Sequence, residues 1–255
     1  MLRLLLSGCN GRMGGMVVQC CASLPDVEIV AGCDLLGMDG RDFPVFSSPA
    51  GVSCPIDVAV DFSSPSALEG LLWFCQTRKI PLVLATTGHS PQQAEAVERA
   101  ARSIPIFRAA NLSVGANVLA WLVRQATAYL GEAYDVEIIE RHHRYKKDAP
   151  SGTALLLARA ASDGLSSPLT PVCRGFGRGV PRGHGEVGMC CVRGGGISGD
   201  HTVLLAGTDE VLELSHSALS RATFASGAVK AARFIAEVTQ PGLYGMEDLI
   251  HHLQC

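Results

Sequence analysis

The amino-acid sequence predicts an α/β fold built on a doubly wound parallel sheet. Three observations support this prediction. Short apolar runs alternate with helical patterns through the first half of the chain, and a glycine-rich turn follows the first apolar run. From about Asn111 the alternation gives way to three helical patterns and a series of strands. Strands that alternate with helices form βαβ units, whose right-handed crossovers place helices on both faces of a sheet.

The first half of the chain contains the alternating segments. The predicted strands are Leu2–Ser7, Val27–Cys33, Val58–Phe62, Leu82–Thr86 and Ile104–Ala109. The predicted helices are Met13–Leu24, Ser66–Gln76 and Pro91–Arg102. Ligands of such sheets bind at the carboxyl ends of the strands, so we expect the functional residues of this half to follow the strands.

The second half has a different organisation. Its predicted helices are Ala116–Leu130, a segment from about Ser151, and Thr223–Ala236. Its predicted strands are Val136–Glu140, Val187–Arg193, Thr202–Ala206 and Glu210–Ser217. The loop Arg174–Gly185 is rich in glycine and arginine, and it has two interpretations: a disordered linker, or a mobile loop at an active site or oligomer contact.

The bulk composition excludes several classes of protein. The chain has 255 residues, of which 47% are hydrophobic, so it can bury a core in one large or two modest domains. Its formal net charge of −3 gives no overall basic field for nucleic acid. No apolar run reaches the roughly 18 residues of a membrane span, and Met1–Ser7 is too short for a secretory signal. We therefore expect a cytoplasmic protein with no membrane or nucleic-acid partner.

Ten cysteines are spread along the chain, and none of them forms a Cys-x-x-Cys motif. Disulfide frameworks are typical of small secreted domains, which this chain does not resemble. We expect most of the cysteines, including the pairs Cys20–Cys21 and Cys190–Cys191, to be buried as small hydrophobic residues.

The glycine-rich turn lies between the first predicted strand and the first predicted helix. Its glycines, from Gly8 to Gly14, are spaced Gly-x-x-Gly-x-x-Gly. Glycine lets the backbone approach a pyrophosphate, whose charge is favourable at a helix N-terminus. Asp34 follows the second predicted strand, where a carboxylate can bond the hydroxyls of an adenosine ribose. The alternative is an ordinary turn followed by a solvated aspartate.

Two further strand ends carry small polar residues. Asp61–Ser64 and Ala85–Gly88 lie at the carboxyl ends of the predicted strands that begin at Val58 and Leu82. Either segment alone is equally well explained as a turn. Together with the glycine-rich turn they outline one crevice at the carboxyl edge of the sheet.

The densest cluster of charge lies between residues 137 and 154. Four basic residues and two histidines fall within positions 141–147, after a predicted strand and before a predicted helix. The segment Pro150–Thr153 favours a helix start, whose first N–H groups attract a carboxylate. The cluster therefore predicts a site for an anionic substrate, with histidine as a proton-transfer group and lysine as a charge or proton donor.

Three other interpretations apply to this cluster. A basic run is often only a solvated face. His142 and His143 could be metal ligands, but neighbouring residues of a strand point to opposite faces and no third ligand is apparent. Contact with nucleic acid is disfavoured by the net charge and by the lack of an adjacent aromatic platform for stacking.

The segment Glu137–Ala154 resembles the signature of a known family, 4-hydroxy-tetrahydrodipicolinate reductase, long called dihydrodipicolinate reductase, of the diaminopimelate route to lysine. That signature reads Glu-[Ile/Val]-x-Glu-x-His-x-x-x-Lys-x-Asp-x-Pro-Ser-Gly-Thr-Ala, and every fixed position is matched. The turn Gly8–Gly14 is similar to the family's cofactor turn. Arg193–Gly196, Gly199–Thr202 and Gly242–Met246 are similar to its C-terminal features, so the resemblance extends through nearly the whole chain.

The resemblance implies a Rossmann-like doubly wound parallel-sheet domain with an inserted α+β mixed-sheet domain. Residues 1–113 and 223–255 would bind the dinucleotide. Residues 114–222 would bind the substrate, a small dicarboxylate, and would form the interface of a homotetramer. The implied activity is the NADH- or NADPH-dependent reduction of 4-hydroxy-tetrahydrodipicolinate to tetrahydrodipicolinate.

The resemblance, together with the strand ends, also implies roles for individual residues. His142 would donate or accept a proton, and Lys146 would donate one, so these two residues would be catalytic. The residues that would bind the cofactor are Gly8, Cys9, Asn10, Gly11, Arg12, Met13, Asp34, Phe62, Ala85, Thr86, Thr87, Ala109, Ala110, Asn111 and Leu112. The residues that would bind the substrate are His143, Lys146, Gly152 and Thr153. No metal is expected.

The chain departs from the family pattern in three places. Ala85 stands where glycine is common, Leu112 stands where an aromatic residue is common, and the segment between Asp34 and Val58 is short and lacks a clear helix. The first two changes affect contacts beside the nicotinamide, and the third affects one flank of the adenine site.

The residues near Asp34 favour NADH over NADPH. Family members that use NADPH well commonly place an arginine directly after the acid, and this chain has Leu35 there. A 2′-phosphate would lie against the carboxylate of Asp34. Arg12 on the glycine-rich turn could still reach that phosphate, and the next base along the chain is Arg41.

Two rival functions differ in their expected residues. Another oxidoreductase of this fold class, such as an aspartate or homoserine dehydrogenase, would need a different catalytic loop. A nucleotide-sensing protein descended from such a reductase would be expected to lack His142 or Lys146, and both are present.

Overall fold

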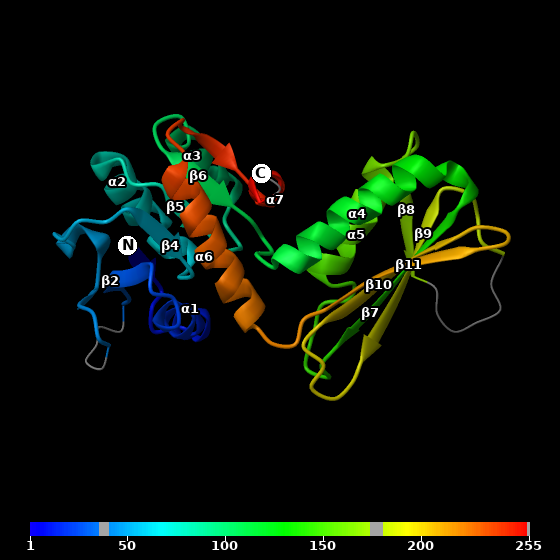
Figure 1. Cartoon of the computed structure of the whole chain (residues 1–255), viewed down its shortest axis with the longest axis horizontal. Helices are drawn as coiled ribbons and strands as arrows, with labels where there is room; N and C mark the ends of the chain where they lie inside the picture. The colour runs from blue at the N-terminus through cyan, green and yellow to red at the C-terminus, as the bar shows by residue number, and fades with distance from the viewer. Residues whose placement is uncertain (36–40, 174–180, 254–255) are drawn as a thin grey trace. The chain divides into compact units, whose positions relative to one another are not determined.

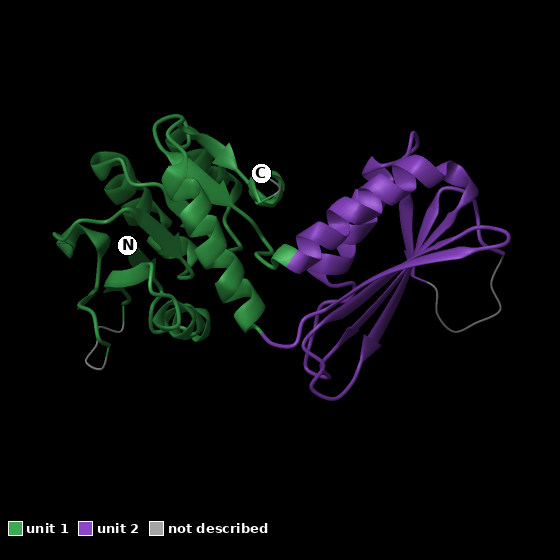
Figure 2. Ribbon diagram, viewed as in Figure 1, with its two compact units in different colours: residues 1–114, 221–255 green, residues 115–220 purple. Residues whose placement is uncertain are grey.

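The computed structural model of the chain describes residues 1–35, 41–173 and 181–253. It forms two compact units, Met1–Val114 with Arg221–Cys255, and Gly115–Ser220 (Figure 2). The sequence placed these boundaries after residue 113 and after residue 222. Most of the glycine- and arginine-rich loop at 174–185 lies outside the described residues, so neither interpretation of that loop is tested.

The first unit is built on a parallel sheet whose described strands have the order β12-β6-β5-β4-β1-β2-β3 (Figure 1). The strands are β1 (Leu2–Ser7), β2 (Val27–Cys33), β3 (Val45–Phe46), β4 (Val58–Asp61), β5 (Leu82–Leu84), β6 (Pro105–Arg108) and β12 (Gly242–Tyr244). Ser7 pairs with Cys33 and with Asp61, and Asp61 pairs with Leu84. This register brings the carboxyl ends of the central strands to one edge of the sheet.

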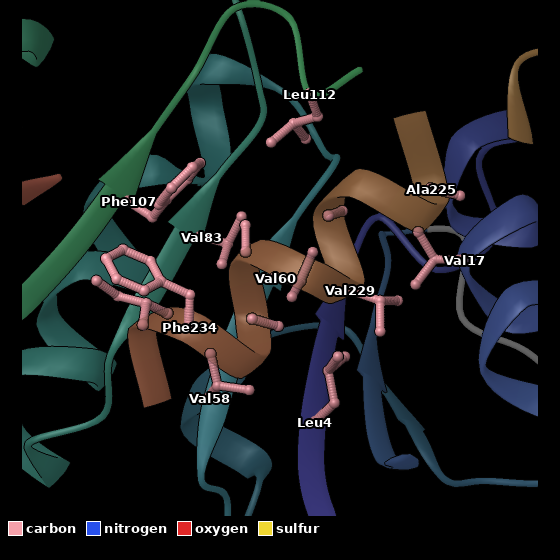
Figure 3. Packing of buried hydrophobic residues seen from close by; sticks show 14 of the residues in the cluster. Leu4, Val17, Val58, Val60, Val83, Phe107, Leu112, Ala225, Val229 and Phe234 are labelled. Atoms are coloured by element: carbon pink, nitrogen blue, oxygen red, sulfur yellow. The ribbon is translucent and has the colours of Figure 1, made fainter. Parts of the chain in front are cut away.

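Helices cover both faces of this sheet. The helices α1 (Arg12–Ala22), α6 (Ala222–Glu237) and α7 (Met246–His252) pack on one face, and α2 (Leu68–Arg78) and α3 (Pro91–Ala100) pack on the other. Residues of a strand alternate between the two faces. Leu4 and Leu6 of β1 therefore join the cluster around α6, drawn in Figure 3, while Leu5 joins the cluster around α2.

The second unit has a mixed sheet with two helices on one face. The strands are β7 (Asp135–His142), β8 (Thr170–Cys173), β9 (Glu186–Arg193), β10 (Asp200–Ala206) and β11 (Val211–Ser217), in the order β11-β10-β7-β9-β8. Strand β7 is antiparallel to β10 and parallel to β9. The helices are α4 (Val114–Leu130) and α5 (Gly152–Asp163). Val136 and Ile138 face these helices, so Glu140 and His142, two and four residues beyond Ile138, lie on the same buried face.

The predicted fold class is confirmed, and the predicted long elements are all present. The elements that the sequence did not show are short: β3, β8, β12, α7 and the 3-10 turns at Pro49–Gly51, Pro65–Ala67 and Gly131–Ala133. Between Asp34 and Val58 the described residues contain only β3 and the first of these turns, as expected for a segment without a clear helix. Among the described residues, no helix is both long and apolar enough to span a membrane.

The prediction that most cysteines are buried is wrong for several of them. In the described ranges, Cys9, Cys21, Cys33 and Cys75 are buried, whereas Cys173 and Cys190 are exposed. Cys190 lies on β9 opposite Ile139, on the face of the sheet that α4 and α5 do not cover. All nine described cysteines are free thiols.

Candidate active site

The glycine-rich turn lies at the carboxyl edge of the first unit's sheet, between β1 and α1. Gly8 has a φ of +77°, and a Cβ on it would lie 2.4 Å from the carbonyl oxygen of Phe62. A Cβ on Gly14 would lie 2.2 Å from the carbonyl oxygen of Gly8. Both positions therefore need glycine, because the backbone of the turn packs directly against the start of α1 and the end of β4.

Helix α1 begins directly after the glycine-rich turn. Its N-cap is Gly11, which provides no side-chain acceptor, and its first turn contains no acidic residue. The first N–H groups of a helix lack intrahelical acceptors and carry the positive end of the helix dipole. A phosphate group is therefore favourable at the positions of Arg12 and Met13.

Asp34 lies beside this turn, and so does a base that the sequence did not place there. The backbone N–H of Asn10 donates to Oδ2 of Asp34 at 3.1 Å. The guanidinium of Arg41 donates to the carbonyl oxygen of Cys9 at 2.7 Å and to Oδ1 of Asn10 at 3.3 Å. The edge where a ribose would bind thus holds one carboxylate and one guanidinium.

The remaining predicted cofactor residues follow β4, β5 and β6 at the same edge. Phe62 follows β4, Ala85–Thr87 follow β5, and Ala109–Leu112 follow β6. Among described side chains, Oγ1 of Thr86 and Nδ2 of Asn10 are shielded from solvent and have no hydrogen-bond partner. A dinucleotide laid along this edge would supply polar groups for both atoms, so the residues fit such a ligand.

Two predicted cofactor residues have side chains in the hydrophobic core. Cys9 and Leu112 are 0% and 3% exposed and belong to the cluster around α6 (Figure 3). A Cβ on Gly227 of α6 would lie 1.7 Å from the carbonyl oxygen of Leu112, which shows how closely this segment packs. At both positions only the backbone is suited to contact a cofactor.

The second unit holds a buried carboxylate at the centre of a polar network. Glu140 on β7 is fully buried. Arg193 donates to its two oxygens at 2.9 and 2.7 Å, and the backbone N–H of Ser151 donates to Oε1 at 3.2 Å. Nδ1 of His142 also contacts this carboxylate, at Oε2. A buried charge is tolerated when paired and hydrogen-bonded in this way.

These contacts determine the charge state of Glu140. Burial alone would raise its pKa, but the hydrogen bonds from Arg193, His142 and the thiol of Cys191 outweigh burial and lower the pKa to about 2. The carboxylate is therefore ionised at neutral pH and can only accept hydrogen bonds. The neutral ring of His142 must then carry its proton on Nδ1, which leaves Nε2 with the lone pair.

Nε2 of His142 lies beside Gly199. A Cβ on Gly199 would be 3.0 Å from Nε2, and this glycine has a φ of +156°. Burial lowers the pKa of His142, and the hydrogen bond to Glu140 acts in the opposite direction. The ring is therefore neutral near pH 7 and has one nitrogen available for proton exchange.

A second buried imidazole, which sequence reasoning missed, completes the network. The rings of His201 on β10 and His142 meet edge to face with centroids 5.1 Å apart. Nε2 of His201 is 3.0 Å from Oγ of Ser151, the N-cap of α5, whose hydroxyl accepts from the N–H of Ala154. Burial lowers the pKa of His201 to about 4.

Glu140, His142 and His201 each offer a ligand atom, and these atoms lie within 4.8 Å of one another. The sequence had indicated no third ligand beside the two adjacent histidines. However, the guanidinium of Arg193 is already bonded to both carboxylate oxygens of Glu140, and a cation there would repel a metal ion. The arrangement suits proton transfer better than metal binding.

The loop between β7 and α5 carries the other predicted substrate residues. Nζ of Lys146 lies 2.9 Å from Oδ2 of Asp148, and Gly152 is exposed at the first position of α5. Nδ1 of His143 is shielded from solvent and has no partner among the described residues. The structure thus brings His142, His143, Lys146, Gly152 and Thr153 to one end of the second unit, around the N-terminus of a helix.

Two family models match this chain. They are described as Dihydrodipicolinate reductase, N-terminus, over residues 2–112, and Dihydrodipicolinate reductase, C-terminus, over residues 115–250. The chain belongs to the dihydrodipicolinate reductase family. This membership confirms the resemblance seen in the Glu137–Ala154 segment.

Relatives of this family match over nearly their full length. A 4-hydroxy-tetrahydrodipicolinate reductase from Clostridium tetani is 42% identical over 253 residues, and one from Caldanaerobacter subterraneus is 46% identical over 250 residues. Each alignment covers 98% of both chains. A dipicolinate-bound dihydrodipicolinate reductase from a Paenisporosarcina species superposes with a TM-score of 0.81 at 26% identity, and covers 97% of this chain and 99% of that one.

Proposed function

We propose that this protein reduces 4-hydroxy-tetrahydrodipicolinate to tetrahydrodipicolinate with NADH or NADPH, in the diaminopimelate route of lysine biosynthesis. The observation that carries the proposal is the buried Glu140–His142 pair, which shares one network with the start of α5 and the loop of Lys146. The curated relatives bear the name of this enzyme, and the solved relative is named for bound dipicolinate, a planar dicarboxylate.

The first unit would bind the dinucleotide at the carboxyl edge of its sheet. Gly8–Met13 would hold the pyrophosphate, Asp34 would bond the adenosine ribose, and the segments Ala85–Thr87 and Ala109–Leu112 would contact the nicotinamide end. When bound, the cofactor supplies the hydride. The residues of this chain orient it and match its charge with the N-terminus of α1.

The second unit would bind the two carboxylates of the substrate. Lys146 and His143 offer donors on the loop, and the N–H groups of Gly152 and Thr153 lie at the start of α5. Donors on both sides of a rigid dicarboxylate would fix its orientation and raise its affinity. The fixed orientation would raise the rate, because the reacting atoms are held in position.

His142 is suited to move the proton that completes the reduction. After water is lost from the substrate, hydride and a proton add across the unsaturated ring, so each turnover consumes one protonated group. With Nδ1 held by Glu140, the exchanging atom would be Nε2, where the neutral ring would first take up a proton from solvent and then pass it to the substrate. Lys146, next to the bound carboxylates, would be the second proton donor.

We infer a modest preference for NADH over NADPH. The support is Asp34, which follows β2 beside the glycine-rich turn and would bond the ribose, and Leu35, which provides no positive charge. Arg41 bonds the backbone of the turn and would reduce the discrimination, because its guanidinium lies beside Asn10. One partly screened like-charge contact is worth on the order of 1–2 kcal/mol.

We also infer a cytoplasmic homotetramer without a membrane or nucleic-acid partner. The face of the second unit's sheet that α4 and α5 leave uncovered exposes Val192 and Val211, which are apolar residues suited to an interface between copies. Light scattering on the purified protein tests the assembly, and a monomer at micromolar concentration would contradict it.

The catalytic assignment is tested by replacing the two proposed proton donors. His142→Gln and Lys146→Ala should each lower kcat by roughly 100-fold or more, as expected when a general acid is lost, with little change in cofactor affinity. Lys147→Ala, an exposed neighbour on the same loop, is the matched control and should keep kcat. The assay follows NADH oxidation with the product of dihydrodipicolinate synthase as substrate. Near-normal kcat in both variants would contradict the assignment.

A further inference from the structure

We propose that Arg193 and Glu140 are positioning residues that act through His142 and through the loop of Lys146. The inference deepens the proposed function and rests on it for its kinetic part. Neither residue would touch the substrate. Arg193 would hold the carboxylate of Glu140 in one orientation, and that carboxylate would hold His142 in the tautomer and rotamer needed for proton exchange at Nε2.

The contacts between Arg193 and Glu140 hold both side chains in one orientation. Arg193 bonds both oxygens of Glu140, at 2.9 and 2.7 Å, and such bidentate pairs restrict both partners. Strand pairing brings Arg193 beside His142, since these two residues are opposite each other on β9 and β7. Glu140 also accepts from the N–H of Ser151, so the carboxylate cannot turn without breaking several bonds.

The guanidinium has a second connection that reaches the other proposed proton donor. Nη2 of Arg193 donates to the carbonyl oxygen of Asp148 at 2.7 Å. The side chain of Asp148 in turn pairs with Lys146. One arginine therefore anchors both halves of the proposed proton chemistry, the imidazole on β7 and the lysine on the loop before α5.

His142 is surrounded by charged and titratable groups from several elements. They are Glu140 on its own strand, Arg193 on β9, His201 on β10 and Lys146 on the loop. Glu140 raises the pKa of His142, whereas Arg193 and Lys146 lower it, and these act on a pKa that burial already depresses. Removing Glu140 or Arg193 should therefore move the titration of His142 in opposite directions.

The test uses four variants of the full chain: Glu140→Gln, Arg193→Met, Arg193→Lys and, as control, Arg182→Met. Arg182 precedes β9 and donates to the carbonyl oxygens of Val136 and Glu186. It therefore also joins β7 to β9, but at the opposite end of the strand pair from Arg193. The readouts are the NMR titration of His142, assigned with His142→Gln in the histidine-labelled protein, and the pH dependence of kcat.

Glu140→Gln and Arg193→Met should shift the pKa of His142 in opposite directions. Glu140→Gln should lower the pKa of His142 by about one unit or more, and Arg193→Met should raise it. Both should lower kcat by roughly 10- to 100-fold, because a misplaced donor loses the benefit of positioning. Arg193→Lys keeps the charge, so it should restore the pKa while it recovers only part of kcat. Arg182→Met should leave the titration of His142 as in the parent.

The results separate this inference from the proposed function. If Glu140→Gln and Arg193→Met leave the tautomer and pKa of His142 unchanged, as Arg182→Met should, or shift the pKa in the same direction, the positioning role is wrong. If the parent shows no reduction of the substrate while the NMR shifts appear with opposite signs, the proposed function fails and the positioning of His142 stands.

Discussion

The buried imidazole of His201 should make the second unit sensitive to acid. Burial lowers the pKa of His201 from 6.5 to about 4 in the folded protein. Below about pH 6.5 the unfolded chain takes up a proton that the folded chain does not bind, so unfolding is favoured as the pH falls. The loss of stability begins near pH 6.5 and levels off below about pH 4, where the folded protein also binds the proton.

The size of the effect follows from those two pKa values. A shift of one pKa unit corresponds to 1.36 kcal/mol, so the complete loss is about 3 kcal/mol. Between about pH 7.5 and about pH 5, His201 alone should reduce the free energy of unfolding by about 2 kcal/mol. His142 and His216, whose pKa values burial also lowers, act in the same direction. The contribution of His201 is therefore isolated by comparing the parent with His201→Gln.

Tryptophan fluorescence can follow the second unit alone. The chain has two tryptophans, with Trp73 on α2 of the first unit and Trp121 on α4 of the second. In a Trp73→Phe background, urea unfolding at pH 7.5 and pH 5 should show that His201→Gln loses about 2 kcal/mol less than the parent. His184→Gln, at an exposed position, is the control. An equal loss in the parent and His201→Gln would refute the argument.

The remaining predictions concern the two ligands. Pyridine-2,6-dicarboxylate should compete with substrate, and calorimetry on the cofactor complex should show affinity that falls with salt and falls at least roughly tenfold in Lys146→Ala. Leu35→Arg should raise kcat/KM for NADPH relative to NADH, whereas Arg41→Ala should lower kcat/KM for NADPH more than for NADH. A clear preference of the parent for NADPH, or identical changes for both cofactors in Arg41→Ala, would contradict the assignment of this edge.

The fold of the first unit could be predicted because its signals are local. Strands such as Val58–Asp61 are buried on both faces and therefore read as continuous apolar runs. The helices between them have their own periodicity and caps, as in α3, where Ser90 and Gln93 form a capping box. The short strands β3 and β12 lie at the two edges of the sheet, where pairing with one neighbour determines their existence, and no local pattern reports that pairing.

The candidate site was predictable only where its residues are adjacent in the sequence. His142, Lys146 and Gly152 lie in one segment, so the cluster of charge before a helix start was visible. Arg193 and His201 were seen only as members of segments that resemble the family's C-terminal features, without a role of their own. They join the site because β9 and β10 pair with β7 in a register that opposes Arg193 to His142 and His201 to Glu140. Packing of the whole sheet sets that register, so spacing along the chain does not reveal it.

The network contains one buried ion pair, Glu140 with Arg193, and one that is partly exposed to solvent, Lys146 with Asp148. Glu140 is buried and bonded to Arg193, so exchanging its partners would leave a buried charge unpaired. Lys146 instead pairs with Asp148, whose side chain is 61% exposed, and such a pair contributes little stability. Under the proposed function, a substrate carboxylate would replace Asp148 on Lys146 at small cost, while the Glu140–His142 pair keeps its geometry. This division would let the basic loop bind the proposed dicarboxylate without disturbing the buried imidazole.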